Sequence, residues 1–179
     1  MTRTRTHFSP LARFLHWTMA PLIVAMLFIG VGMVATVSRA HDTLIAIHKP
    51  LGIALLLLVV IRASVRLRRG SPPLPHDMPA SQKMAAKGSH AVLYALMFAM
   101  PLIGWAMLSA AGYPLTLWGP FHLPPIAPHN VELFAVLRAL HTWLALALFG
   151  TVLLHLAAAL FHGLIRRDGV FSSMARGGR

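Results

Sequence analysis

The sequence predicts an all-α integral membrane protein, a four-helix bundle in a single domain over residues 1–179. Two observations predict this fold. Hydrophobic residues make up 57% of the chain and charged residues only 11%, a composition typical of membrane proteins. The hydrophobic residues also fall into four runs, which are separated by polar or Pro-rich connections. Four spans of about 20 residues with their connections use nearly the whole chain, so we expect no second domain.

The four expected helices lie at approximately residues 14–37, 45–67, 88–110 and 134–166. The first resembles a cleaved signal peptide in two respects, because basic residues precede it and "TVSRA" loosely resembles a processing site. Its apolar run is longer than a signal core of about 7 to 15 residues, however, and Arg39 disfavours cleavage there. We therefore predict that it is retained. The third run is the shortest and reaches membrane length only with its small-residue continuation.

Two connections between the expected helices are distinctive. The second, "RGSPPLPHDMPASQK", is Pro-rich and polar, which is typical of a solvated connection. The third, "SAAGYPLTLWGPFHLPPIAPHN", mixes Pro and Gly with Tyr113, Trp118 and Phe121. Aromatic residues are enriched where a bilayer meets water, so we expect this segment to lie at the membrane interface.

The charge distribution indicates which way the helices run. The formal net charge is +12, from 16 Lys and Arg against 4 acidic residues. These cations flank the apolar runs, so we expect a lipid bilayer and no nucleic acid as the partner. Most lie in the two tails and the second connection, which predicts cytoplasmic termini by the positive-inside rule. The opposite side holds only Arg39, Lys49 and Arg138.

The chain has no cysteine and 11 histidines. It therefore has no disulfide, no thiolate metal site and no cysteine nucleophile, and histidine is the most plentiful residue able to bind a metal. Four histidines lie in tails or loops beside polar or Pro residues, and we expect them to be solvated: His7, His76, His122 and His129.

The last expected helix contains the stretch "HTWLALALFGTVLLHLAAALFH", with His141, His155 and His162 in an otherwise apolar segment. His141 and His155 are 14 residues apart, which places them within roughly 40° of one helix face and about 21 Å apart along the axis. His162 follows 7 residues later, on the same stripe of a regular helix. A polar imidazole in hydrocarbon needs a hydrogen bond or a metal.

Depth in the membrane pairs these histidines with others. His141 lies level with His48 near the outer side, and His155 lies level with His16 near the inner side. Each depth thus has two imidazoles that face each other. A bis-histidine haem requires one such pair, since neutral imidazole is a good axial ligand of iron, so the two depths could hold two haems. The alternative for any single one is an interhelical hydrogen bond, which is the commoner role of a lone membrane histidine.

Segments of all four helices resemble the bacterial cytochrome b561 family. The matching stretches are "LARFLHW", "IHKPLGIALLLLVVIRASVRLR", "SHAVLYALMFAMPLIGW" and "LHTWLALALFGTVLLHLAAALFH". The resemblance covers nearly the whole chain and includes the histidine positions. It is greatest to the short four-helix members that act as superoxide oxidases, which are superoxide:ubiquinone oxidoreductases of the bacterial inner membrane.

The resemblance implies two haems b and a set of site residues. It implies that His16 and His155 bind the iron of the cytoplasmic-side haem and that His48 and His141 bind that of the periplasmic-side haem. These are the pairs that depth also selects. It further implies that His90 and His162 lie near a pocket for ubiquinone, the electron acceptor.

The interpretation that follows is a one-electron transfer across the membrane. We expect Lys49 and Arg138, with Arg39 as a third candidate, to attract superoxide to the outer haem edge through their positive field. The electron then passes to the inner haem and to ubiquinone, with His162 or His90 offering a proton. For Lys49 and Arg138 the alternative role is to pair with haem propionates or lipid head groups.

Two other functions are compatible with parts of the pattern. A dihaem anchor subunit would pass electrons between a periplasmic dehydrogenase or hydrogenase and quinone. Such a subunit needs a docking surface for a partner protein, and the outer loops here are short. A histidine-lined transporter without haem would explain the intramembrane histidines but not their pairing, and none of the four carboxylates lies mid-membrane: Asp42, Asp77, Glu132 and Asp168.

Overall fold

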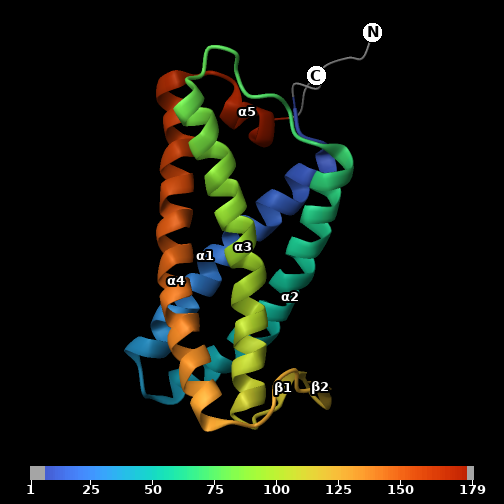
Figure 1. The fold of residues 1–179 in the computed structure, drawn as a ribbon, viewed down its shortest axis with the longest axis vertical. Coiled ribbons are helices and arrows are strands. Elements are labelled where there is room, and N and C mark those ends of the chain that lie inside the picture. Colours follow the sequence, from blue (N-terminus) through green and yellow to red (C-terminus); the bar gives the residue numbers. More distant parts are fainter. Residues whose placement is uncertain (1–6, 177–179) are drawn as a thin grey trace.

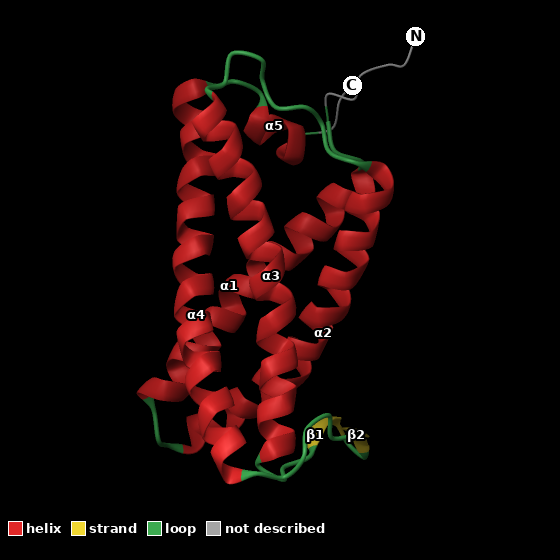
Figure 2. Ribbon diagram, viewed as in Figure 1, coloured by secondary structure: helices red, strands yellow, loops and turns green. Residues whose placement is uncertain are grey.

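A computed structural model describes residues 7–176 of the chain, and it contains four long helices (Figures 1 and 2). They are α1 (Pro10–Ala35), α2 (Arg39–Arg69), α3 (Ala80–Ala110) and α4 (Val131–Leu160). Each of the four has a segment long and apolar enough to cross a membrane. The predicted all-α membrane fold is therefore confirmed. Three of the tail arginines that enter the orientation argument, Arg3, Arg5 and Arg179, lie outside the described residues, as do both ends of the predicted domain.

All four helices begin earlier than predicted from the sequence, and polar side chains outside the apolar runs cap three of them, α1, α2 and α4. The Ser9 hydroxyl accepts a hydrogen bond from the Ala12 amide at 3.3 Å, which starts α1 at Pro10. Ser38 caps α2 in the same way, so that its helix includes the polar stretch before residue 45. The Asn130 side chain accepts from the Leu133 amide at 2.8 Å and starts α4. Such caps satisfy amide groups that a helix end leaves unpaired.

The end of the last predicted helix differs from the prediction. The α-helix stops at Leu160, and Phe161–Arg166 continue as a π-helix, η1. The chain then turns through two residues with positive φ, Arg167 at 51° and Gly169 at 84°, into a short helix α5 (Val170–Ala175) that the sequence analysis did not predict. The regular spacing of 3.6 residues per turn therefore does not extend to His162.

The third connection forms a β-hairpin, which was also not predicted. Strand β1 (Leu115–Trp118) pairs antiparallel with β2 (Phe121–Leu123), with an irregular register between Thr116 and Trp118. Gly119, with φ of 51°, makes the turn. Hydrogen bonds from the Trp105 indole to the Pro124 carbonyl (2.9 Å) and from the Ile126 amide to the Ser109 hydroxyl (3.1 Å) hold this connection against α3.

The hairpin defines one end of the bundle, and the other end carries the start of α1, the α2–α3 connection and α5 (Figure 1). We call these the hairpin end and the terminal end. At the terminal end, the Trp17 indole donates to the Met174 carbonyl at 3.1 Å. The Phe8 amide donates to the Ser173 carbonyl, also at 3.1 Å, so the first and last described segments touch.

The helices pack as two pairs. The backbones of α1 and α2 lie against each other, as do those of α3 and α4, whereas α1 and α2 approach α4 less closely. A buried cluster of Leu93, Leu96 and Leu148 joins α3 to α4. Many large apolar side chains point outward, as expected where lipid is the solvent. The two pairs meet where α2 packs against α3 and also along the looser seam between α4 and the α1–α2 pair.

Candidate functional site

Two histidines face each other across this seam at the hairpin end. His48 of α2 and His141 of α4 have ring centroids 6.3 Å apart and ring planes at 66°. The Nδ1 atom of each ring is buried and lacks a hydrogen-bond partner. An unpartnered polar atom in a membrane is costly, so these rings are poorly satisfied by the protein alone.

A second pair lies across the seam at the terminal end. His16 of α1 and His155 of α4 also have ring centroids 6.3 Å apart, with planes at 78°. Here a third imidazole joins them, because the His90 ring of α3 lies 5.3 Å from that of His155. His90 Nδ1 is 2.6 Å from the Ala86 carbonyl oxygen, to which it donates. The terminal end therefore carries a group of three histidines.

The two 6.3 Å distances fit a metal held between opposed imidazoles. With a metal-to-nitrogen bond of about 2 Å on each side, two axial imidazoles have centroids about 6 to 6.5 Å apart. The His90–His155 distance is too short for such a pair. Within residues 7–176, no three His, Cys, Asp or Glu side chains are arranged to hold a metal ion by themselves. Both pairs thus fit the axial positions of a haem, whose macrocycle supplies the remaining ligands.

Two glycines leave room beside the rings at the hairpin end. A Cβ atom at Gly104 would lie 3.2 Å from His141 Cε1, closer than side chains normally pack. A Cβ atom at Gly30 would lie 3.9 Å from His48 Cε1, an ordinary contact. The absence of a side chain at Gly104 therefore allows the His141 ring to occupy its present position.

The cations predicted to act at the outer side lie at the hairpin end. Lys49 follows His48 on α2 and is half-buried, whereas Arg138 is exposed near the start of α4. No described hydrogen bond or ion pair joins either side chain to a carboxylate. At the terminal end, the half-buried Arg62 donates from Nη1 to the Ala12 carbonyl at 3.0 Å, and Arg66 lies over the Tyr94 ring.

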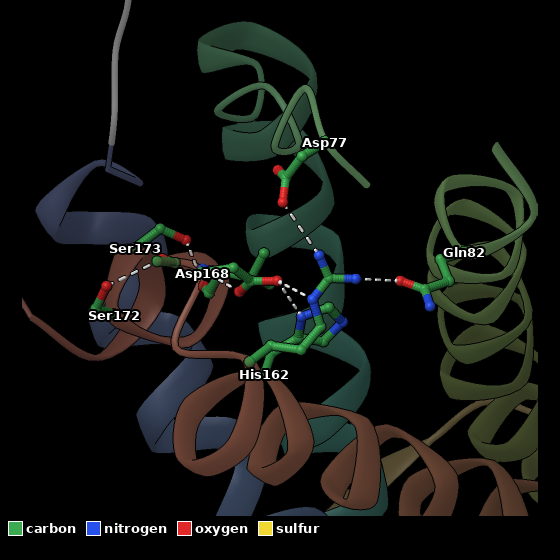
Figure 3. Close-up of polar contacts among 9 residues, drawn as sticks. Asp77, Gln82, His162, Asp168, Ser172 and Ser173 are labelled. Atoms are coloured by element: carbon green, nitrogen blue, oxygen red, sulfur yellow. Dashed lines mark hydrogen bonds and ion pairs between the residues drawn. The ribbon is translucent and has the colours of Figure 1, made fainter. Parts of the chain in front are cut away.

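His162 lies apart from the histidine pairs. Its Nδ1 is 2.6 Å from Asp168 Oδ2, which belongs to the turn before α5 (Figure 3). The ring also lines a cavity of about 330 Å³ between η1 and α5, together with Leu160, Arg167, Phe171 and Arg176. No described contact joins His162 to His90, the other histidine expected near a quinone pocket.

Asp168 and the ion pairs around it were not predicted from the sequence. Arg166 contacts Asp168, Asp77 and Gln82 and so joins η1 to the α2–α3 connection and α3. Only the π-helix and the positive φ of Arg167 bring Asp168 back to His162. The sequence carries no periodic signal for that contact. The histidines expected to be solvated, His76, His122 and His129, are exposed, while His7 is half-buried.

Comparisons with known proteins agree with the resemblance seen in the sequence. The family model described as prokaryotic cytochrome b561 matches residues 7–177. Cytochrome b561 homolog 2 of Escherichia coli strain K12 is 30% identical over 177 residues, which cover 97% of this chain and 93% of that protein. Cytochrome b561 homolog 1 of the same organism is 29% identical, over 93% of this chain and 96% of that protein.

A third relative, described as probable superoxide oxidase CybB of Yersinia pestis, is 32% identical over 166 residues, or 89% of this chain and 90% of that protein. The matched residues run from end to end of the bundle. A family of bacterial membrane proteins agrees with the four membrane-length helices. The chain therefore belongs to the prokaryotic cytochrome b561 family, whose members are multi-pass membrane electron-transfer proteins with haem b.

Proposed function

We propose that the protein is a dihaem superoxide:ubiquinone oxidoreductase of the bacterial inner membrane, with its hairpin end toward the periplasm and its termini in the cytoplasm. The observation that carries the proposal is the repeated 6.3 Å histidine pair, one at each end of α4. The similarity to a probable superoxide oxidase supports the choice of electron donor. When bound, each haem supplies a one-electron redox centre.

Four histidines would hold the two haems, His16 with His155 and His48 with His141. With its iron held by two protein side chains, each haem would supply one-electron transfer, and superoxide would act as the electron donor. The overall reaction takes two superoxide anions, one ubiquinone and two protons to two O₂ and one ubiquinol.

At the hairpin end, we assign Lys49 and Arg138 to the attraction of the superoxide anion. Cations without carboxylate partners raise the local concentration of a small anion and its rate of encounter, an effect that salt weakens. We expect Lys49→Glu to lower the rate with superoxide and to flatten its dependence on ionic strength. A variant that keeps both the rate and the salt dependence would exclude this role for Lys49.

At the terminal end, we assign quinone reduction to the region of His90 and His162. His162 lines the cavity of about 330 Å³, within the range of small-molecule sites. His90 lies against the His155 ring. An imidazole ring can donate a proton to a quinone oxygen, which suits both side chains to this step.

The proposal is tested with purified protein in anaerobic detergent or liposomes. We expect the pyridine haemochrome to give two haems b per chain, and added potassium superoxide to reduce them. Subsequent ubiquinone should reoxidise them. A protein without haem would support the transporter alternative. A dihaem protein that superoxide leaves oxidised would instead support the anchor-subunit function, with a dehydrogenase or hydrogenase as electron partner.

A further inference from the structure

The contact between His162 and Asp168 brings together two polar side chains that are largely shielded from solvent. Their side chains are 15% and 8% exposed, and Nδ1 and Oδ2 are 2.6 Å apart. The pair lies where η1 ends and α5 begins (Figure 3), and His162 lines the cavity that we associate with quinone. A short hydrogen bond between an imidazole and a carboxylate fixes the orientation of the ring.

The other contacts of Asp168 determine the direction of this hydrogen bond. Oδ2 also forms an ion pair with Arg166 Nε at 3.3 Å, and Oδ1 accepts a hydrogen bond from the Val170 amide at 3.2 Å. A carboxylate oxygen can only accept, so with Asp168 paired to a guanidinium the proton of this hydrogen bond is assigned to Nδ1 of His162. His162 Nε2 has no hydrogen-bond partner in the described part of the chain and is the nitrogen left for proton exchange.

Arg166 also contacts residues outside η1, which fixes its position beside Asp168. Besides Asp168, it donates from Nη1 to Gln82 Oε1 at 2.8 Å and from Nη2 to Asp77 Oδ2 at 3.3 Å (Figure 3). Asp77 is 74% exposed and does not touch His162. The two carboxylates therefore share one arginine but differ in their contact with the histidine.

The cavity next to His162 has the character of a site for a flat ring with polar edges and an apolar tail. Leu160, Leu164 and Phe171 give it apolar walls, and Arg167 and Arg176 contribute cations. Gly163 allows Phe171 to approach, since a Cβ atom there would lie 3.1 Å from its Cγ. This combination matches the head group of a quinone, with carbonyl oxygens that accept hydrogen bonds.

We propose that Asp168 is a positioning residue for proton transfer to ubiquinone, which it serves by fixing the His162 ring at the wall of the cavity through Nδ1 and leaving Nε2 free to exchange a proton. This inference rests on the proposed function. In each proton transfer, the Nε2–H bond of the His162 imidazolium breaks and an O–H bond forms at a ubiquinone oxygen. The neutral ring then regains a proton from cytoplasmic water. Two such transfers, with two electrons from two superoxide anions, give ubiquinol, while Asp168 stays ionised and keeps the Nδ1 proton bound to the ring.

The test compares Asp168→Asn with Asp77→Asn in the full-length, haem-loaded protein. An amide at position 168 neither stabilises the imidazolium nor selects one tautomer of His162. We expect Asp168→Asn to slow ubiquinone-driven reoxidation by about tenfold to a hundredfold and to increase its solvent deuterium isotope effect. Reoxidation by ferricyanide, which takes up no proton, should stay unchanged. Asp77→Asn should match the unsubstituted protein in all three measurements.

A double variant distinguishes a role of Asp168 that acts through His162 from a general loss of structure. In the His162→Gln background, Asp168→Asn should cause no further slowing, because the two residues act as a unit. Equal slowing by Asp77→Asn, or equal slowing with ferricyanide, would overturn the proposal in favour of a structural role. If the unsubstituted protein is not reoxidised by ubiquinone, the proposed function fails and this role fails with it. If it is reoxidised and Asp168→Asn is as fast, only the role of Asp168 fails.

Discussion

The two ends of the bundle carry the same histidine pair in different surroundings. At the hairpin end, His48 and His141 face each other with no third imidazole, and their buried Nδ1 atoms lack partners. At the terminal end, His16 and His155 have the same 6.3 Å separation, but the His90 ring packs on His155. The pairing geometry is thus common to both ends.

The residues around the histidine pair differ between the two ends. The hairpin end has cations and one further half-buried histidine, His41, whose Nδ1 donates to the Met33 carbonyl at 2.9 Å and which no described ring contact joins to the pair. The terminal end adds His90, the half-buried Arg62 and the His162–Asp168 pair, groups that exchange protons or balance charge. Under the proposed function, this difference would place proton uptake by ubiquinone at the terminal end.

Removal of one ligand from either pair should have the largest effect. We expect His141→Leu to lower the haem content from two per chain to one, because the pair at the hairpin end loses an axial ligand, and His155→Leu to do the same at the terminal end. The pyridine haemochrome gives the ratio of haem to protein. His122→Leu, in the exposed hairpin, is the matched control and should keep both haems. Two haems in His141→Leu would contradict the assignment of that pair.

Removal of the third imidazole should have an intermediate effect. We expect His90→Phe to keep two haems and to slow ubiquinone-driven reoxidation by about tenfold, since a group able to exchange protons is lost beside His155. Stopped-flow absorbance measures the rate. If His90→Phe instead loses a haem, then His90 rather than His16 is the partner of His155, and the two ends differ in their ligand geometry as well.

The smallest effect is expected from the glycines at the hairpin end. In Gly104→Ala, the new Cβ would lie 3.2 Å from His141 Cε1, so the ring must move by a few tenths of an ångström. Such overpacking costs about 1 kcal/mol or more, and we expect a lower temperature for loss of the haem absorbance. Gly30→Ala is the control, because its Cβ would lie at 3.9 Å from His48 while the gain in helix propensity is the same. Equal shifts in the two variants would show that the contact at Gly104 is unimportant.

Much of the fold could be predicted because the bilayer imposes length. A helix needs about 20 apolar residues to cross the hydrocarbon, and the four runs meet that requirement. The helix ends could not be predicted from the same signal. Ser9 and Asn130 start α1 and α4 through capping hydrogen bonds in polar segments that hydropathy does not count.

The candidate site, like the fold, could be predicted only in part. Position along a helix gives depth, and depth alone selected His48 with His141 and His16 with His155, whose rings do lie opposite each other. Their role as haem ligands stays a prediction. The depth of a histidine does not specify which neighbouring helix its side chain contacts, so the contact of His90 with His155 could not be predicted.

By itself, the sequence determined the number of membrane helices, the depth of each histidine and the side on which cations gather, because these follow from hydropathy and from a constant rise per residue. Only the tertiary structure decided the contact between His162 and Asp168. That contact depends on a π-helix and a left-handed residue at Arg167, which turn the chain back on itself after α4. Such turns depend on packing between distant segments, and no periodicity in the sequence records them.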